Sequence, residues 1–348
     1  MAVDCPSGLN CDSGALDELA LPASLTVTFA GAKRGHFRFP GAAACGELVV
    51  ADIGIPADLP DVAQVQVAVM TAADARERQP KRPLSGHKGT FGTAVIAAGS
   101  THYWGRAHPG RQSRLPGGGG PGRPGRAHNH SRRLRHPTAG SHLPLIPDSQ
   151  ILGPASVSVL QATKGDALLI GPGLDAADAF ITDLLAAKET LPPLVIDADG
   201  LNVLASKEAW WKRLPPHTIL TPHPGEMARL MGVTLADLQE RDRVALAQEK
   251  AAAWGCVLLL KGAYTVIAAP DGRLTINPFA NPALAVAGSG DVLSGVITGL
   301  LAQGVAPFDA ARLGAYLHGA AAAQYAYDSG LLMRELCDFL PEVMAREK

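Results

Sequence analysis

Short apolar runs that end in turns bearing glycine, proline or aspartate recur along the chain, and they limit its fold more than any other feature. Such runs are too short for buried helices and suit parallel strands that are buried on both faces. They are TAVIAA (93–98), ALLI (167–170), PLVI (193–196), TIL (218–220) and VLLL (257–260). We therefore expect an α/β fold with a mostly parallel central sheet and crossover helices on its faces.

The C-terminal part of the chain adds a hairpin and helices to this pattern. Asp271-Gly272 separates two apolar runs and predicts a β-hairpin. Residues 291–301 and 309–327 are rich in small and apolar residues, and they predict two long helices.

Residues 1–56 form a separate piece with two strand-like runs, at 25–29 and 48–53. A piece of this size with few apolar anchors is marginal as an independent domain. The following stretch, 57–83, has prolines at both ends of a polar middle and is expected to be a linker. We therefore expect three parts: the piece 1–56, the linker 57–83 and a main domain over 84–345.

The segment 104–143 differs from the rest of the chain. It contains nine Gly, eight Arg and no Lys, Asp or Glu, and without it the formal charge changes from -1 to -9. The alternatives are a basic arm for nucleic acid, a flexible insertion and translation out of frame. The absence of Lys argues against a basic arm, because such arms usually mix Lys with Arg. Read one nucleotide later from Arg106, the codons permit an alanine-rich helix, a glycine turn and a strand. The sequence favours a shifted frame, with the segment disordered, and the nucleotide sequence of codons 100–148 tests this.

Composition excludes several classes of protein. The balance of 31 basic and 32 acidic residues argues against a cationic nucleic-acid binder. The chain has no apolar run long enough to span a membrane and no secretion signal at Met1, so we expect a cytoplasmic protein without a membrane partner. Its five cysteines show no CxxC pair and are expected to be reduced.

The strongest chemical signal is the turn Gly288-Ser289-Gly290-Asp291 at the start of a predicted helix. Glycines let successive backbone N–H groups point into one concavity, and the helix adds its positive end, so an anion such as a phosphate is expected there. Asp291 lies beside that site and is placed to accept a proton from a hydroxyl group during phosphoryl transfer. The alternative is that Asp291 is simply the N-cap of the helix.

Polar side chains also follow the predicted strands, where open α/β sheets bind ligands. Lys261 follows 257–260 and is a candidate for a nucleotide phosphate, or it is a solvated lysine at a turn. His223 lies between two prolines, which favours a ligand contact over a core position, and Glu226 is a first-turn charge of the next helix. Asp197 and Asp199 are candidates for Mg²⁺ through water, or for helix capping.

Six ordered motifs together resemble the ADP-dependent NAD(P)H-hydrate dehydratases of the ribokinase-like superfamily, over about residues 80–345. They are GHKGTFG (86–92), GPGL (171–174), DADGLN (197–202), TPHPGEMARL (221–230), KGAYTVI (261–267) and NPALAVAGSGDVLSG (281–295). VDCPSGLN (3–10) and LVVADIGIP (48–56) resemble the end of the NAD(P)H-hydrate epimerase domain that is often fused upstream.

The resemblance implies a three-layer ribokinase-like fold and a repair reaction. Hydrated NADH or NADPH would be returned to the working cofactor with ADP or ATP as phosphoryl donor: the 6-hydroxyl is phosphorylated and phosphate is then eliminated. Asp291 corresponds to the family's substrate-contacting base, and Gly173 and His223 correspond to hydrate contacts. The nucleotide contacts correspond to Lys261, Gly262, Ala263, Tyr264, Thr265, Gly288, Ser289 and Gly290. Mg²⁺ is expected with the nucleotide.

Two departures from the family pattern bear on function. The segment 104–143 replaces an expected helix and strand, which includes a contact to the hydrate. The upstream part of the epimerase domain is absent, so Asp4, which corresponds to a hydrate contact, and Ser7, which corresponds to a potassium contact, are expected not to function. The alternatives are a ribokinase-like kinase of a small alcohol and a non-catalytic nucleotide binder or pseudogene product. A homo-oligomer stays open.

Overall fold

The computed structural model describes residues 1–56, 58–87, 89–99, 157–158, 160, 163–175 and 177–346. The chain divides into two compact units, Met1–Val69 and Met70–Lys348. The segment 104–143, for which the sequence predicts a shifted frame and disorder, lies outside the described residues, as does Lys88.

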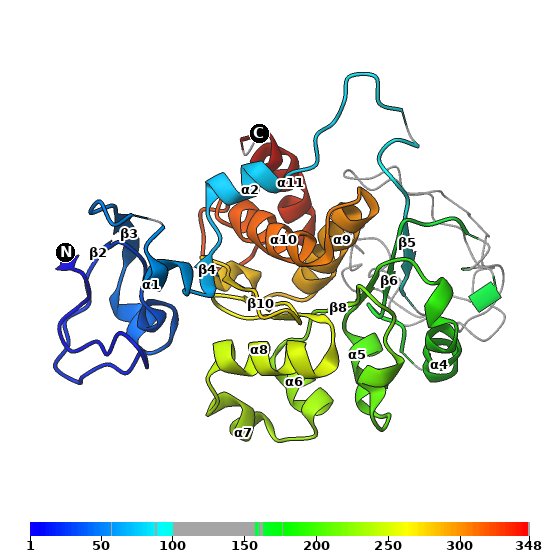
Figure 1. Ribbon diagram of the computed structural model, residues 1–348, viewed down its shortest axis with the longest axis horizontal. Coiled ribbons are helices and arrows are strands. Elements are labelled where there is room, and N and C mark those ends of the chain that lie inside the picture. The colour runs from blue at the N-terminus through cyan, green and yellow to red at the C-terminus, as the bar shows by residue number, and fades with distance from the viewer. Residues whose placement is uncertain are drawn as a thin grey trace, which may run out of the picture. The chain divides into compact units, whose positions relative to one another are not determined.

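The first unit contains a small parallel sheet (Figure 1). Thr26 and Thr28 of its central strand are fully buried, and the Thr26 hydroxyl donates a hydrogen bond to the carbonyl of Cys45, which offsets the cost of burial. Both strand-like runs expected in this piece are present. The strands, in sheet order, are β1 (Ala2–Val3), β2 (Leu25–Phe29) and β3 (Glu47–Ala51), and the unit also contains η1 (Arg34–Phe37), η2 (Gly41–Ala44), α1 (Pro60–Ala63) and β4 (Val67–Val69).

The second unit contains the expected α/β sheet. Its strands lie in the order β11-β10-β9-β8-β7-β6-β5, and the neighbours from β5 to β9 are all parallel. β10 is antiparallel to both β9 and β11, so the hairpin predicted at Asp271-Gly272 is confirmed. The strands are β5 (Ala94–Ala97), β6 (Ala167–Ile170), β7 (Leu194–Ile196), β8 (Ile219–Leu220), β9 (Val257–Leu260), β10 (Val266–Ala268) and β11 (Leu274–Ile276).

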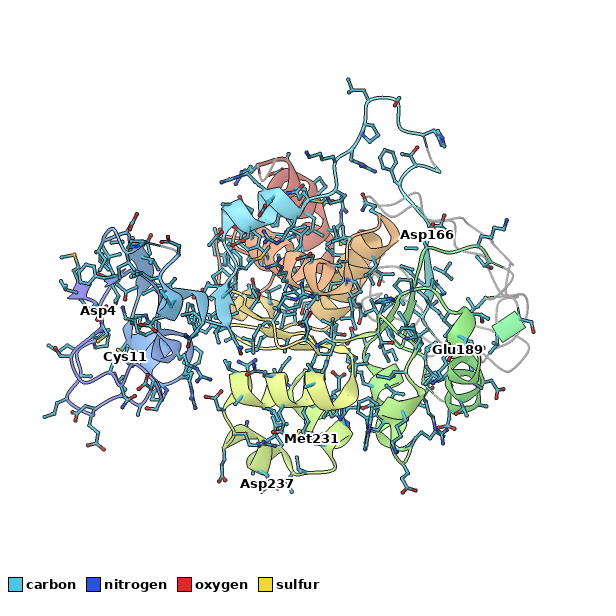
Figure 2. The ribbon with its side chains drawn as sticks, viewed as in Figure 1. Asp4, Cys11, Asp166, Glu189, Met231 and Asp237 are labelled. Carbon is cyan, nitrogen blue, oxygen red and sulfur yellow. The ribbon has the colours of Figure 1, made fainter. Side chains whose placement is uncertain are left out.

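Helices cover both faces of this sheet, which makes three layers (Figure 1). One layer contains α2 (Ala72–Arg78), α9 (Ser289–Ala302), α10 (Pro307–Ala322) and α11 (Met333–Arg346). The other contains α4 (Asp178–Ala186), α5 (Asp199–Ala205), α6 (Pro224–Met231), α7 (Leu235–Gln239) and α8 (Arg243–Trp254). Met231 ends α6 and Asp237 lies in α7, as Figure 2 shows. Short 3-10 turns are η3 (Lys188–Thr190), η4 (Trp210–Arg213) and η5 (Pro282–Leu284).

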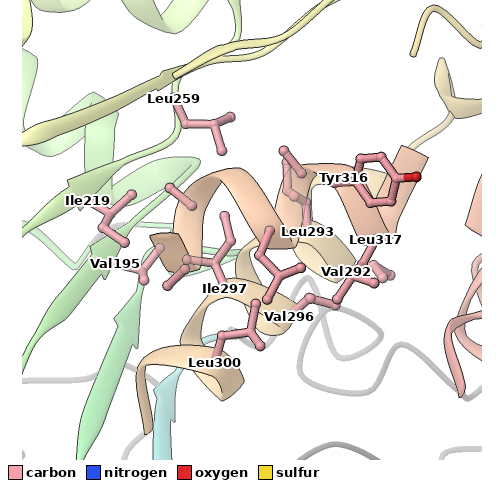
Figure 3. Packing of buried hydrophobic residues seen from close by; sticks show 14 of the residues in the cluster. Val195, Ile219, Leu259, Val292, Leu293, Val296, Ile297, Leu300, Tyr316 and Leu317 are labelled. Atoms are coloured by element: carbon pink, nitrogen blue, oxygen red, sulfur yellow. The ribbon is translucent and has the colours of Figure 1, made fainter. Parts of the chain in front are cut away.

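The core of the second unit lies between the sheet and α9 (Figure 3). Val195, Ile219 and Leu259 from three neighbouring strands face Ile297 of the helix, and these four side chains are fully buried. Burying such an apolar side chain contributes about 1.5–3 kcal/mol. This packing fixes where α9 begins relative to the strand ends, and the glycine turn lies at that point.

Two expectations about the elements need correction. The stretch 57–83, expected to be a linker, contains α1, β4 and α2, and Met70 and Ala75 are buried in the core of the second unit. In α2 the apolar residues alternate with charged ones, so composition alone did not indicate a helix there. The helix expected over 309–327 ends at Ala322. The wider domain boundaries 1–56 and 84–345 stay a prediction.

Candidate active site

Four parallel strands end along one edge of the sheet, and each is followed by a residue that the sequence singled out. Gly171, Asp197, Thr221 and Lys261 directly follow β6, β7, β8 and β9, which are neighbours. This edge, where the carboxyl ends of the strands meet, is where open α/β sheets bind ligands. The fold therefore brings together motifs that are far apart in the sequence.

Lys261 lies at this edge, after β9, between two buried carboxylates. Its Nζ is 2.7 Å from Oδ1 of Asp197 and 3.6 Å from Oε2 of Glu226. The side chains of Asp197 and Glu226 are 1% and 5% exposed, and that of Lys261 is 17% exposed. The interpretation of Lys261 as a solvated turn lysine is therefore wrong, and Glu226 is more than a first-turn charge of its helix.

The charge state of Lys261 follows from this setting. Burial by itself lowers the pKa of the ammonium group. The charges of Asp197 and Glu226, the hydrogen bond to Asp197 and the charge of Asp291 raise it by more than burial lowers it, so the net effect is a raised pKa. Lys261 thus stays a cation at neutral pH. A Cβ added at Gly290 would lie 3.3 Å from Nζ, so the glycine turn passes close to this cation.

The glycine turn begins α9 as predicted. Gly288 is the N-cap and has a φ of +91°, a backbone conformation that favours glycine. Asp291 is in the first turn of the helix, so the interpretation of Asp291 as its N-cap is wrong. The turn is also held by a hydrogen bond to the preceding segment: the Ser289 hydroxyl donates to the carbonyl of Leu284 over 2.8 Å.

His223 is the N-cap of α6 and is half exposed. Its Nδ1 accepts hydrogen bonds from the backbone N–H groups of Gly225 at 3.0 Å and Glu226 at 3.3 Å, and its Nε2 is 3.4 Å from the Glu226 carboxylate. Burial lowers the pKa of His223, and the nearby cation of Lys261 adds to this effect while Glu226 opposes it. An acceptor role at Nδ1 requires the neutral ring with the proton on Nε2. His223 therefore presents a donor, Nε2–H, at this edge.

The two aspartates of the DADGLN motif diverge. Asp197 binds Lys261, while Oδ2 of Asp199 accepts a hydrogen bond from the backbone N–H of Asp175 over 3.2 Å. They do not share a ligand position, so water-mediated Mg²⁺ binding by the pair is not supported. Among the residues the structure describes, no group of three or more His, Cys, Asp or Glu side chains could hold a metal ion.

Two glycines follow β6, and each position requires glycine for a different local reason. Gly171 has a φ of +126°, and a Cβ there would overlap the carbonyl oxygen of Asp197, so the backbone of β6 packs directly on the loop that carries Asp197. Gly173, the candidate hydrate contact, has a φ of +66° in the following turn. Both positions favour glycine for backbone reasons, independently of any ligand.

Sequence reasoning missed two side chains that contact these motifs. Arg243, the first residue of α8, donates hydrogen bonds to carbonyl oxygens around Lys261. His318 of α10 lies with its Nε2 3.0 Å from the carbonyl oxygen of Ser289. Neither residue belongs to a glycine-rich or strand-end motif, so no local signal singled them out.

The candidate residues of the first unit have their own contacts. Oδ1 of Asp4 accepts hydrogen bonds from Nζ of Lys33 at 2.6 Å and Oγ1 of Thr28 at 2.9 Å, and Ser7 is exposed. The hydrogen bond from Lys33 is the main cause that lowers the pKa of Asp4. Asp4 and Cys11 are labelled in Figure 2, and all five cysteines are free thiols. The potassium role of Ser7 stays a prediction.

Burial of His318 makes stability depend on pH. Burial is the main cause that lowers its pKa to about 4, from 6.5 in the unfolded chain; the Ser289 carbonyl opposes this shift and the charge of Lys261 adds to it. The unfolded chain therefore binds more protons between these values. The contribution is fully present above about pH 6.5 and is lost as the pH falls towards 4, by about 3 kcal/mol in total.

We expect the free energy of unfolding of the wild type to fall more steeply than that of His318→Gln between pH 7 and pH 4.5. Denaturant unfolding at several pH values measures the difference. His217→Asn, at an exposed histidine, is the control and should follow the wild type. Equal slopes for the wild type and His318→Gln would contradict the buried neutral state of His318.

The fold and the site together define a class of protein: a three-layer α/β protein with a glycine turn at the start of a helix and a buried lysine at the carboxyl ends of its strands. A ribokinase-like superfamily protein from Enterococcus faecalis has the same fold, with a TM-score of 0.62 and 22% identity over 81% of this chain and 97% of that chain. The ribokinase-like fold expected from the resemblance is thereby confirmed.

The comparisons with known sequences specify the family. The NAD(P)H-hydrate dehydratase family matches residues 138–342, and the YjeF-related protein N-terminus matches residues 1–35. The chain belongs to the NAD(P)H-hydrate dehydratase family. It is 32% identical to the ADP/ATP-dependent NAD(P)H-hydrate dehydratase of Bacillus subtilis, a structure co-crystallized with ATP/Mg²⁺, with a TM-score of 0.62 over 82% of this chain and 100% of that one.

Longer relatives match almost the whole chain. The Bifunctional NAD(P)H-hydrate repair enzyme Nnr of Moorella thermoacetica is 43% identical over 99% of this chain and 66% of its own length. The relative of the same name from Thermofilum pendens is 35% identical over 99% of this chain and 66% of its own. The chain thus spans about two thirds of the length of these relatives.

Among the described residues, no helix is both long and apolar enough to cross a membrane.

Proposed function

We propose that this chain dehydrates hydrated NADH and NADPH back to the working cofactors, with ADP or ATP as phosphoryl donor. The observation that carries the proposal is the cluster at the sheet edge. There the Gly288–Gly290 turn, the Lys261 cation and the Asp291 carboxylate are brought to one place by β9 and α9. An anion site, a cation and a base are the parts that phosphoryl transfer needs.

The proposed reaction has two steps. The 6-hydroxyl of the hydrate gives its proton to Asp291 as its oxygen bonds to the terminal phosphorus of ADP, and AMP leaves. The C6–O bond then breaks, phosphate leaves with that oxygen, and the neighbouring ring carbon gives a proton to water as the ring double bond forms. Lys261 and the N–H groups of the glycine turn stabilise the charge on the transferred group. His223 and Gly173 are assigned to the hydrate, and Lys261 to Thr265 with Gly288 to Gly290 to the nucleotide.

Mg²⁺ is proposed to arrive with the nucleotide and to be held mainly by its phosphates. Mg²⁺ usually keeps waters and binds one or two carboxylates together with substrate phosphates, and Asp197 is already paired with Lys261, which leaves Asp291 as the carboxylate for such an ion. Such an ion would neutralise phosphate charge near Asp291. K⁺ at Ser7 and a hydrate contact at Asp4 belong to the epimerase-like unit and are proposed only for a longer protein that completes it.

An activity assay with hydrated NADH tests this function. We expect ADP and Mg²⁺ together to restore NADH absorbance, with AMP and phosphate formed in equal amounts. The full chain and a second chain, in which 104–143 is translated in the shifted frame, are assayed in parallel. Recovery by the second chain alone would support both the function and the frame prediction.

Three other results would overturn the proposal. Accumulation of a phosphorylated alcohol without NADH recovery would indicate a ribokinase-like kinase of a small alcohol. Binding of ADP by calorimetry without turnover in either chain would indicate a non-catalytic nucleotide binder. Salt-sensitive binding of DNA would indicate the basic-arm alternative.

A further inference from the structure

Arg243 holds the loop after β9 through its guanidinium group. Nη1 donates to the carbonyl of Ala263 over 2.7 Å, and Nη2 donates to the carbonyls of Leu260 at 3.1 Å and Lys261 at 3.2 Å. The remaining carbonyl in this run, that of Gly262, accepts a hydrogen bond from the Thr265 hydroxyl over 2.9 Å. Four consecutive carbonyl oxygens, those of residues 260–263, therefore accept hydrogen bonds from side chains.

The direction of these carbonyls decides the direction of the amides. Each trans peptide is planar, so its N–H points away from its carbonyl oxygen. The N–H of Gly262 therefore points away from Arg243, and the N–H of Ala263 points away from the Thr265 hydroxyl. Backbone N–H groups in such turns can bind an anion.

Arg243 does not stabilise its own helix, α8, from its position in the first turn. A cation in the first turn of a helix is unfavourable by about 0.3–1 kcal/mol, and Asp242 already caps α8 with its side chain. Burial lowers the pKa of Arg243, and its Nε is buried without a hydrogen-bond partner among the described residues. Gly262 gives the guanidinium room, because a Cβ there would lie 2.8 Å from Nη2.

We propose that Arg243 is a positioning residue for nucleotide binding: it holds the carbonyls of Leu260, Lys261 and Ala263 so that the Gly262 amide and the Lys261 ammonium meet a nucleotide phosphate. This inference rests on the proposed function for the identity of the ligand. Arg243 itself contacts neither the phosphate nor the hydroxyl group that reacts. Its loss therefore weakens ADP binding and leaves the chemical step in place.

The test compares Arg243→Lys and Arg243→Ala with Arg241→Lys as the matched control. Arg241 lies two residues away on the surface and pairs with Glu249. In Arg243→Lys one ammonium cannot span the three carbonyls, so we expect the Kd for ADP, measured by calorimetry, to rise at least about tenfold. The KM for ADP should rise equally, with kcat at saturating ADP within about twofold of wild type. Guanidinium at millimolar, non-denaturing concentration should restore ADP affinity to Arg243→Ala.

The outcomes separate this inference from the proposed function. A structural role alone would lower Tm and active fraction while the Kd of the folded protein stayed within twofold of wild type, and that result overturns the inference. If the wild type binds ADP but does not turn over the hydrate, the proposed function fails while the Kd comparison still decides on Arg243. If the wild type binds neither ADP nor ATP, the inference fails as well.

Discussion

Asp291→Asn is expected to lower kcat for ADP-dependent recovery of NADH by about 10²–10⁴-fold, the usual contribution of a general base. The amide keeps the size of the carboxylate but cannot take the proton of the hydroxyl group. Asp291 lies in the first turn of α9 and adds to the charges that raise the pKa of Lys261, so it is close to the cation that would bind the phosphate. Removing its negative charge should leave ADP binding as tight as in wild type or tighter.

Steady-state kinetics and calorimetry on the same preparation measure the two effects separately. Asp271→Asn is the control, because Asp271 is an exposed hairpin residue that pairs with Arg273. It should retain the wild-type kcat. A variant Asp291→Asn with more than a tenth of the wild-type kcat would show that another group accepts the proton.

Lys261→Met is expected to lower the free energy of unfolding by about 3–5 kcal/mol, the largest loss of stability among the proposed variants. Breaking a buried ion pair leaves uncompensated charge. Asp197 and Glu226 are almost completely buried, and Nζ of Lys261 is their shared cation. Denaturant unfolding measures this loss, and ADP affinity should fall with it. Lys261→Met combined with Asp197→Asn should recover much of the stability, because one buried charge is then removed.

Lys250→Met provides the matched comparison. Lys250 lies on α8 and pairs with Glu249, whose side chain is 48% exposed. Surface pairs contribute about 0–1 kcal/mol, so little change is expected. Equal losses for Lys250→Met and Lys261→Met would contradict the buried cluster at the sheet edge.

The elements that sequence predicted well are those with local causes. Buried parallel strands need continuous apolar runs, so the runs at 167–170 and 257–260 coincide with β6 and β9. The turn at Gly288 requires a positive φ, and the hairpin at Asp271-Gly272 requires a particular turn type. In each case the residues that reveal the element are also the ones that form it.

The stretch 57–83 shows where this approach fails. Its prolines and charged residues indicate a linker, yet α2 forms there with Thr71 as N-cap, whose side chain accepts a hydrogen bond from the N–H of Asp74. Arg78 of this helix also pairs with Asp309 of α10. Such a long-range partner is not visible in the local sequence, and it changes which residues the second unit contains.

The sequence by itself determined the α/β class, the glycine turn before α9 and the candidate residues at the strand ends, because each depends on residues that are neighbours in the chain. Only the tertiary structure decided how they combine. Lys261 and Asp197 are 64 residues apart, and His318 and Ser289 are 29 apart. Their contacts exist because the order of β7, β8 and β9 and the packing of α9 and α10 bring them together. Burial then turns a lysine and two carboxylates into a charged cluster, an effect that depends on the surroundings of the side chains.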